Sequence, residues 1–203
     1  MIQINVSVKA RTEHVYLLHS NRERCHRLLQ KKTLAEEEII DFLIALHLVL
    51  EIGINALFRH IVIPTIKKEI DEFKIMKNLD NVSFRDKVTM FVYTSNFDFS
   101  GKLEIASQYH QIIEKLKDFS SIRNQLLHGH SISTIYTEEG NRHSELRKAI
   151  SSAEFLKRHI EKFRFIMEGM RFYLDALGSS LTASGREGLK KEYLDYSFLS
   201  TAK

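Results

Sequence analysis

The sequence contains few of the residues that interrupt helices or form disulfides. Pro64 is its single proline, and it has only eight glycines among 203 residues. A single cysteine, Cys25, excludes an internal disulfide framework. Hydrophobic residues make up 43% of the chain and charged residues 28%, a balance typical of a folded helical protein. We therefore expect an all-α fold.

The sequence also lacks a long uninterrupted apolar run. Its longest apolar-rich stretch, residues 39–50, contains Asp41 and His47, so it is too short and too polar to predict a membrane-spanning helix. The opening MIQINVSVKARTEH has no long apolar stretch of the signal-peptide kind. Glycine-rich phosphate loops and cysteine-based metal spacings are missing from the sequence as well. We expect a cytoplasmic protein that uses no cofactor and no metal.

The net charge of +4 is distributed unevenly. Residues 9–32 carry +5, residues 33–122 carry −4 and residues 123–203 carry +3. A basic balance favours phosphate-bearing partners, although a charge of this size is mild. The segment 11–32 has two interpretations: an arm that contacts RNA, or the solvated basic face of an amphipathic helix.

Apolar spacing and helix-start residues predict the order of the elements. The opening alternation over residues 2–8 indicates either a short edge strand or a tail. Thr33 and Glu36 form a capping-box sequence, which predicts the start of a long helix. Pro64 interrupts that helix. The predicted helices cover residues 11–30, 34–61, 65–76, 84–93 and 103–126, with a loop over 94–101.

Apolar residues from Leu146 to Leu177 recur at steps of three and four, which predicts a long last helix packed nearly antiparallel to its neighbours. Met167 and Met170 belong to this seam and fill a core or a dimer interface. We expect an up-and-down helical bundle. We divide the chain into an N-terminal basic segment (1–32), the bundle (33–180) and a C-terminal tail (181–203). We expect residues 179–188 to be a linker and residues 189–199 a short appendage.

The stretch SSIRNQLLHGHSIS, residues 120–133, ends an apolar helix with polar groups. Arg123 and His128 are five residues apart, so on one helix they point about 140° away from each other. Gly129 is typical of a position just past a helix end. In a structural interpretation, Arg123 pairs with a carboxylate and His128 interacts with the helix dipole. In a functional one, Arg123 holds a phosphate and His128 transfers a proton.

The segment RNQLLHG, residues 123–129, resembles the R-x4–6-H signature of the HEPN superfamily of all-α proteins, many of which are ribonucleases. LHLVLEIGINALFR, residues 46–59, is similar to the first helix of that fold, and the likeness covers about residues 34–178. It implies that Arg123 and His128 are the catalytic pair. The supporting residues it implies are Asn124, Glu51, Asn55 and His130, with Glu51 or Asn55 orienting Arg123.

The resemblance implies a metal-independent endoribonuclease in which the RNA 2′-hydroxyl attacks its own phosphate. Two Arg-His pairs would supply the proton acceptor, proton donor and cationic clamp, so a homodimer is expected. Toxin-antitoxin, stress and anti-phage systems are the settings it suggests, with an antitoxin as a further partner. His130 stands where several such toxins have a tyrosine that a partner enzyme modifies. The alternative is a non-catalytic module that binds a nucleotide or a protein.

Other candidate sites have weaker patterns. His47 and Glu51 stand four residues apart with His60 downstream, and His128 and His130 form an H-x-H pair, but neither group has enough further ligands to predict a metal site. We expect His47 and Glu51 to form a polar pair within the bundle. Cys25 has no identifiable acidic or amide partner, so a nucleophilic cysteine is not expected.

Overall fold

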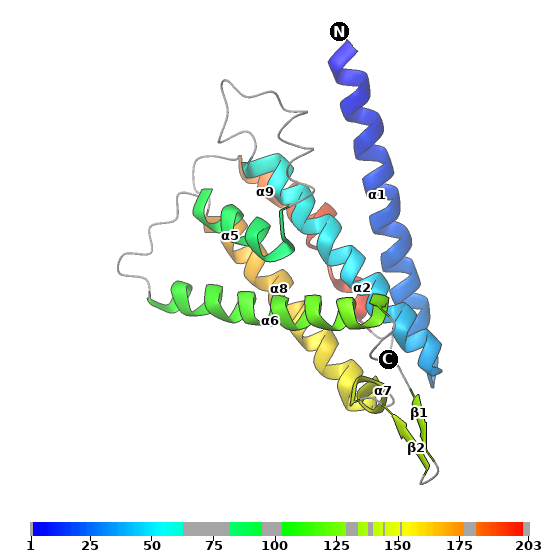
Figure 1. Ribbon diagram of the computed structural model, residues 1–203. Helices are drawn as coiled ribbons and strands as arrows, with labels where there is room; N and C mark the ends of the chain where they lie inside the picture. The colour runs from blue at the N-terminus through cyan, green and yellow to red at the C-terminus, as the bar shows by residue number, and fades with distance from the viewer. Residues whose placement is uncertain are drawn as a thin grey trace.

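The computed structural model describes residues 2–62, 82–94, 103–128, 134–137, 140–143, 145–150, 152–176 and 182–200. It shows a helical bundle with one small β-hairpin (Figure 1). The elements are α1 (Ile2–Leu29), α2 (Glu36–Leu57), the π-helix η1 (Phe58–Val62), α5 (Phe84–Thr94), α6 (Leu103–His128), β1 (Thr134–Thr137), β2 (Gly140–His143), α7 (Glu145–Ile150), α8 (Ala153–Ala176), α9 (Ala183–Tyr193) and the 3-10 helix η3 (Ser197–Leu199). The predicted all-α fold is confirmed.

Helix α2 is the central element of the core. It packs against α1, α5, α6, α8 and α9, and its residues Leu46, Val49 and Leu50 are fully buried. By length and composition alone, Glu36–Ile61 could cross a membrane, yet 67% of that apolar window is buried inside the protein. This burial is typical of the core helix of a helical bundle.

The start of α2 differs from the prediction at Thr33. The helix begins at Glu36 with Ala35 as its N-cap residue, and the Glu38 carboxylate accepts a hydrogen bond of 3.0 Å from the Ala35 backbone N–H. Because Ala35 has no side-chain acceptor, only this half of the reciprocal cap forms. Three successive glutamates in the first turn favour the same start through the helix dipole. The predicted helix over 65–76 lies outside the described residues.

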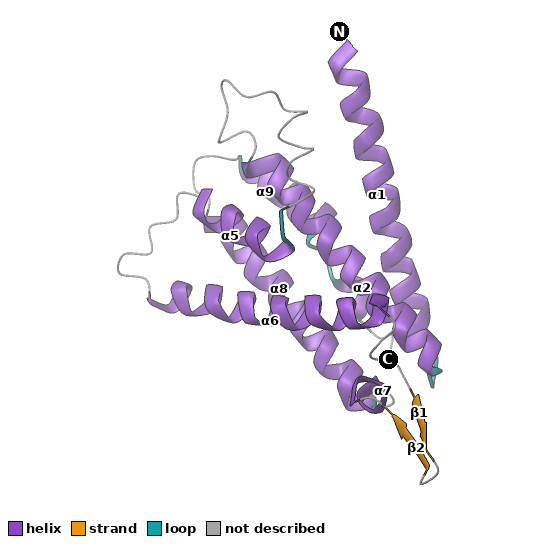
Figure 2. Ribbon diagram, viewed as in Figure 1, coloured by secondary structure: helices purple, strands orange, loops and turns teal. Residues whose placement is uncertain are grey.

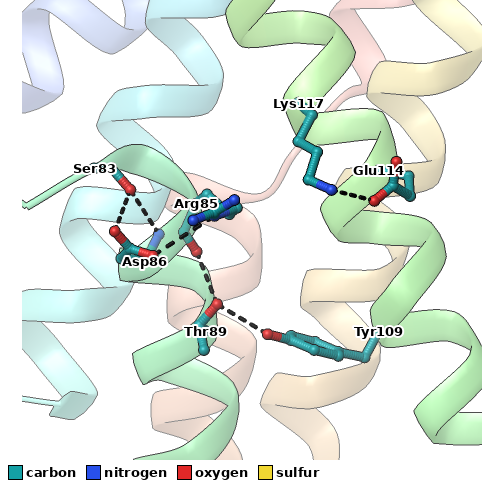
Figure 3. A network of polar contacts seen from close by, with 7 residues as sticks. All are labelled: Ser83, Arg85, Asp86, Thr89, Tyr109, Glu114 and Lys117. Carbon is teal, nitrogen blue, oxygen red and sulfur yellow. Dashed lines mark hydrogen bonds and ion pairs between the residues drawn. The ribbon is translucent and has the colours of Figure 1, made fainter.

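Helix α5 begins where the sequence predicts it. The Ser83 hydroxyl accepts a hydrogen bond of 3.2 Å from the Asp86 backbone N–H and donates one to the Asp86 carboxylate (Figure 3). Farther along, the Tyr109 hydroxyl of α6 donates to the Thr89 hydroxyl at 2.9 Å. The cap and this bond fix where α5 starts and how it lies against α6. The predicted loop over 94–101 lies outside the described residues, apart from Thr94, which ends α5.

Helices α6 and α8 pack through a close approach at a glycine. A Cβ at Gly169 of α8 would lie 2.2 Å from the Ile112 side chain of α6, so this contact favours a residue without a side chain. Phe163, Met167 and Met170, from the predicted apolar seam, are fully buried. The seam is divided between two helices, since α7 ends at Ile150 and α8 begins at Ala153.

The two ends of the chain differ from the predictions in their secondary structure. Residues 2–8 are helical and belong to α1, so the edge-strand interpretation is wrong. The predicted linker is wrong over residues 183–188, which lie in α9; its N-cap residue, Thr182, accepts a hydrogen bond of 3.1 Å from the Gly185 N–H. Leu18 of α1 and Leu194 after α9 are fully buried in the same core as α2. Packing against that core holds both ends in place.

Residues 192–199, here called the C-terminal segment, are bound by basic side chains of α1 and α8. All four bonds go to main-chain carbonyl oxygens of the segment. They are Arg22 to Glu192 at 2.9 Å, His26 to Phe198 at 3.0 Å, Arg164 to Leu199 at 3.0 Å and Arg171 to Leu194 at 3.4 Å.

A β-hairpin follows α6 where the sequence suggested a polar connection. Strands β1 and β2 are antiparallel, with Tyr136 opposite Asn141 and Thr134 opposite His143. Figure 2 shows the two strands at one end of the molecule, next to α7. Each strand has only four residues, so the alternation that identifies a strand is too short to detect.

Candidate functional site

The candidate site starts from a polar stripe on the otherwise apolar core helix α2. His47, Glu51 and Asn55 follow one another at intervals of four residues, so they lie along one face. His47 is only 5% exposed, whereas Glu51 and Asn55 are half-buried. The His47 Nε2 atom lies 3.6 Å from a Glu51 carboxylate oxygen, an ion-pair distance longer than an ordinary hydrogen bond. The expected pairing of these two residues is therefore present but loose.

Helix α5 covers one side of this stripe. The Phe84 ring centroid lies 5.6 Å from that of His47. Lys87, only 7% exposed, donates a hydrogen bond of 2.9 Å to the Asn55 side-chain oxygen. The structure therefore places Asn55 opposite a buried cation of α5. The sequence suggested Arg123 as its partner.

Helix α6 covers the other side and carries Arg123. Phe119 stacks on the His47 ring with a centroid separation of 6.4 Å. Arg123 follows Phe119 by four residues, so the two side chains lie on the same face of α6, next to His47. The half-buried Arg123 guanidinium donates to the Asn124 side-chain oxygen at 3.0 Å. The charge of Arg123 thus acts on His47 of the α2 stripe, while Asn124 binds Arg123 at the surface of α6.

The environment of His47 keeps its imidazole neutral. Burial and, as a smaller contribution, the positive charge of Arg123 together lower the pKa of His47 to about 4. Its Nδ1 atom is buried and has no hydrogen-bond partner within the described part of the chain. Near pH 7, the His47 ring is therefore neutral within the electrostatic reach of the Arg123 guanidinium.

A second buried histidine lies on the other helix that packs against Phe119. His159 of α8 is 3% exposed, and its ring centroid is 4.3 Å from that of Phe119. Burial lowers its pKa to about 4, with a further contribution from Lys162. Neither His159 nor Lys87 has a distinctive sequence pattern, since each is a single polar residue in an amphipathic helix. His47 does have one signal: it interrupts the most apolar run in the chain.

The other candidate residues near the motif, His128 and His130, follow Arg123 in the sequence. His128 is the last residue of α6, which confirms that the helix ends at the motif. His130 lies outside the described residues. Arg123 and His128 are five residues apart along α6.

Three other sequence-based candidates take structural roles or have no support in the described residues. Cys25 is fully buried, and burial raises its pKa to about 12, so the thiol is protonated at neutral pH. No group of three or more metal-binding side chains occurs across the described ranges. In the basic segment of α1, Arg22 binds the C-terminal segment and Arg24 pairs with Asp41 of α2 at 2.5 Å. Part of that segment's charge is thus already used within the fold.

No protein-family model, curated protein or solved structure matches this chain.

Proposed function

We propose that this protein is a metal-independent endoribonuclease of the HEPN type that acts as a homodimer. The observation that carries the proposal is the environment of Arg123. Its guanidinium is half-buried near the end of α6, next to a neutral histidine, and its one hydrogen bond within the described residues goes to the adjacent Asn124. An arginine held in this way retains donors for an RNA phosphate.

The proposed reaction needs two proton transfers and one clamp for negative charge. One His128 accepts the proton of the RNA 2′-hydroxyl as that oxygen attacks the adjacent phosphorus. The 5′-oxygen leaves and takes a proton from the partner's His128. Arg123 stabilises the charge that develops on the phosphate oxygens. The products are a 2′,3′-cyclic phosphate and a 5′-hydroxyl end, and no metal takes part.

The cellular setting belongs to the proposal too. Burial of α2, the described helix that is apolar enough to cross a membrane, supports placing the protein in the cytoplasm. A toxin-antitoxin, stress or anti-phage system is the setting that the motif at 123–129 suggests. Such a system would supply an antitoxin or another protein as a partner.

The test is RNA cleavage by purified protein in the presence of EDTA. We expect cleavage that leaves 2′,3′-cyclic phosphate ends and that falls by about 10²–10⁴-fold in His128→Ala, the usual range for loss of a proton-transfer group. Arg186→Gln, on α9 and away from the motif in sequence, is the matched charge control and should cleave at the normal rate.

Unchanged cleavage in His128→Ala would exclude the proposal. RNA or nucleotide binding without any cleavage would favour the alternative, a non-catalytic binding module. The oligomeric state of the same samples, from light scattering, tests the dimer separately.

A further inference from the structure

His47 has a buried ring nitrogen that has no hydrogen-bond partner among the described residues. The ring is packed between Phe84 of α5 and Phe119 of α6 and is 5% exposed. Its Nε2 atom faces Glu51 at 3.6 Å, while Nδ1 is buried without a hydrogen-bond partner among the described residues. A buried polar atom of this kind is destabilising unless another group binds it. The arrangement therefore calls for a donor near Nδ1.

Arg123 is the candidate donor: its charge acts on His47, although in this structure its guanidinium donates to Asn124 and not to Nδ1. Phe119 stacks on His47, and Arg123 lies one helical turn beyond Phe119 on the same face of α6. A guanidinium has five N–H donors, and the one hydrogen bond of Arg123 in the described structure uses a single donor, toward Asn124. Donors thus remain for both a ring nitrogen and a phosphate.

We propose that His47 is the positioning residue for Arg123: when RNA binds, the guanidinium turns from Asn124, donates one N–H to His47 Nδ1 and holds its remaining donors toward the RNA phosphate. This inference rests on the proposed ribonuclease function and names the group that orients its cation. His47 itself does not touch RNA, because its ring is buried. Glu51, expected from the sequence to orient Arg123, instead lies beside Nε2 and favours the tautomer with the proton there.

The protonation state supports this role. Burial and the charge of Arg123 lower the pKa of His47 to about 4, so the Nδ1 lone pair is available at neutral pH. The charged or titratable groups nearest to the ring are Glu51 on its own helix, Arg123 on α6 and His159 on α8.

His159 offers a matched control within the same protein. It is buried to a similar extent, also contacts Phe119 and also has its pKa lowered to about 4. The groups whose charge acts on it are Lys162, Asp118 and His47, and Arg123 is not among them. Substitutions at His159 should disturb the core without changing how Arg123 is held.

The experiment measures single-stranded RNA binding as a function of salt in a His128→Ala background, which prevents cleavage. Each phosphate contact contributes about 0.7 to the slope of log K against log salt. We expect Arg123→Gln to reduce the slope by about 0.7 and to weaken binding by about 10-fold. His47→Leu and His47→Gln should reproduce that reduction, because neither places an acceptor at the Nδ1 position.

His47→Asn carries its amide one bond closer to the backbone than glutamine, at the position of Nδ1. It should keep the slope and bind within about 3-fold of the parent, a difference below about 0.7 kcal/mol. His159→Leu and His159→Asn should also keep the slope. Thermal unfolding checks that every variant is folded. If His47→Leu does not fold, the comparison between His47→Gln and His47→Asn still tests the inference with two polar residues.

The outcomes distinguish a failure of the inference about His47 from a failure of the proposed ribonuclease function. A slope unchanged in Arg123→Gln would reject phosphate binding by Arg123 and with it the proposed function. A slope reduced in Arg123→Gln but unchanged in His47→Leu and His47→Gln would reject His47 as the positioning residue while the proposed function stands. An equal reduction in His159→Leu would show a general core effect and would also reject it.

Discussion

The arginines of α1 and α8 and the arginine of the motif are used in different ways. Arg22, Arg164 and Arg171 donate to main-chain carbonyls of the C-terminal segment and hold it in place. Arg123 donates instead to Asn124, its own neighbour in the chain. Arg22, Arg164 and Arg171 cannot leave their partners without releasing the C-terminal segment, whereas Arg123 is bound to its neighbour in the chain and can change partner without unfolding anything. The contrast separates cations that stabilise the fold from a cation free to bind a ligand.

The largest expected effect is on RNA cleavage, and it tests this contrast directly. Arg123→Gln should lower RNA cleavage by about 10²–10³-fold, because it removes the charge that stabilises the transition state, while the melting temperature stays within about 2 °C. Arg164→Gln should do the reverse: cleavage is kept, and the free energy of unfolding falls by about 1 kcal/mol as the Leu199 carbonyl loses its donor. Cleavage assays and thermal unfolding measure both. Equal losses of cleavage in the two variants would remove the distinction.

The next effect concerns acid stability and the two buried histidines. In the unfolded chain each has a pKa near 6.5, and in the folded protein about 4. Between pH 6.5 and about 4 the unfolded state therefore binds more protons than the folded state. The free energy of unfolding decreases as the pH is lowered through this range. Each histidine contributes a slope of about 1.4 kcal/mol per pH unit across that window. Denaturant unfolding at several pH values measures it.

His47→Asn and His159→Asn should each remove about half of this histidine-dependent slope. Arg164→Gln, in the region that binds the C-terminal segment, should leave it unchanged. Carboxylates that titrate below pH 5 are common to all of these variants and cancel in the comparison. A variant slope equal to that of the parent protein would show that the substituted histidine is already protonated in the folded state at pH 6.

A smaller effect tests how closely the end of α9 is packed on α2. A Cβ at Gly53 of α2 would lie 2.8 Å from the Tyr193 carbonyl oxygen, so Gly53→Ala should destabilise the protein by about 1–3 kcal/mol. Gly188 of α9 has no atom within 4 Å of such a Cβ, and Gly188→Ala should stabilise the protein by about 0.5–1 kcal/mol. Denaturant unfolding measures the change in the free energy of unfolding for both variants, including its sign. Stabilisation by both would show that this packing is loose.

The smallest effect concerns a hydrogen bond at the surface of the C-terminal segment. The Tyr196 hydroxyl donates to the Glu168 carboxylate at 2.9 Å. Tyr196→Phe should lower the free energy of unfolding by about 0.5–1 kcal/mol and leave cleavage unchanged. Glu168→Gln, which keeps an acceptor, should have a smaller effect. A change in cleavage in either variant would link this segment to the site.

Local signals in the sequence identified part of the fold and one side of the candidate site. The Ser83–Asp86 cap was found because both partners are three residues apart. The end of α6 at His128 was found because the apolar spacing stops there. The start of α2 was misplaced because Thr33 and Glu36 have the spacing of a capping box, whereas the bond at the helix start is made by Glu38 to the Ala35 N–H. Helix α9 was missed because Gly185 and Gly188 are typical of a linker, and the burial of Leu194 and Leu199 after the helix depends on the tertiary structure.

The sequence by itself determined the helical class of this protein, the place of Arg123 near a helix end and the polar stripe on α2. These follow from spacing along one chain, where residues four apart share a helix face. Only the tertiary structure decided which stripe residue lies next to Arg123, that Lys87 binds Asn55, and that a second neutral histidine contacts Phe119. The physical reason is that burial and contact between helices depend on how the helices cross, and no spacing within one helix specifies that crossing.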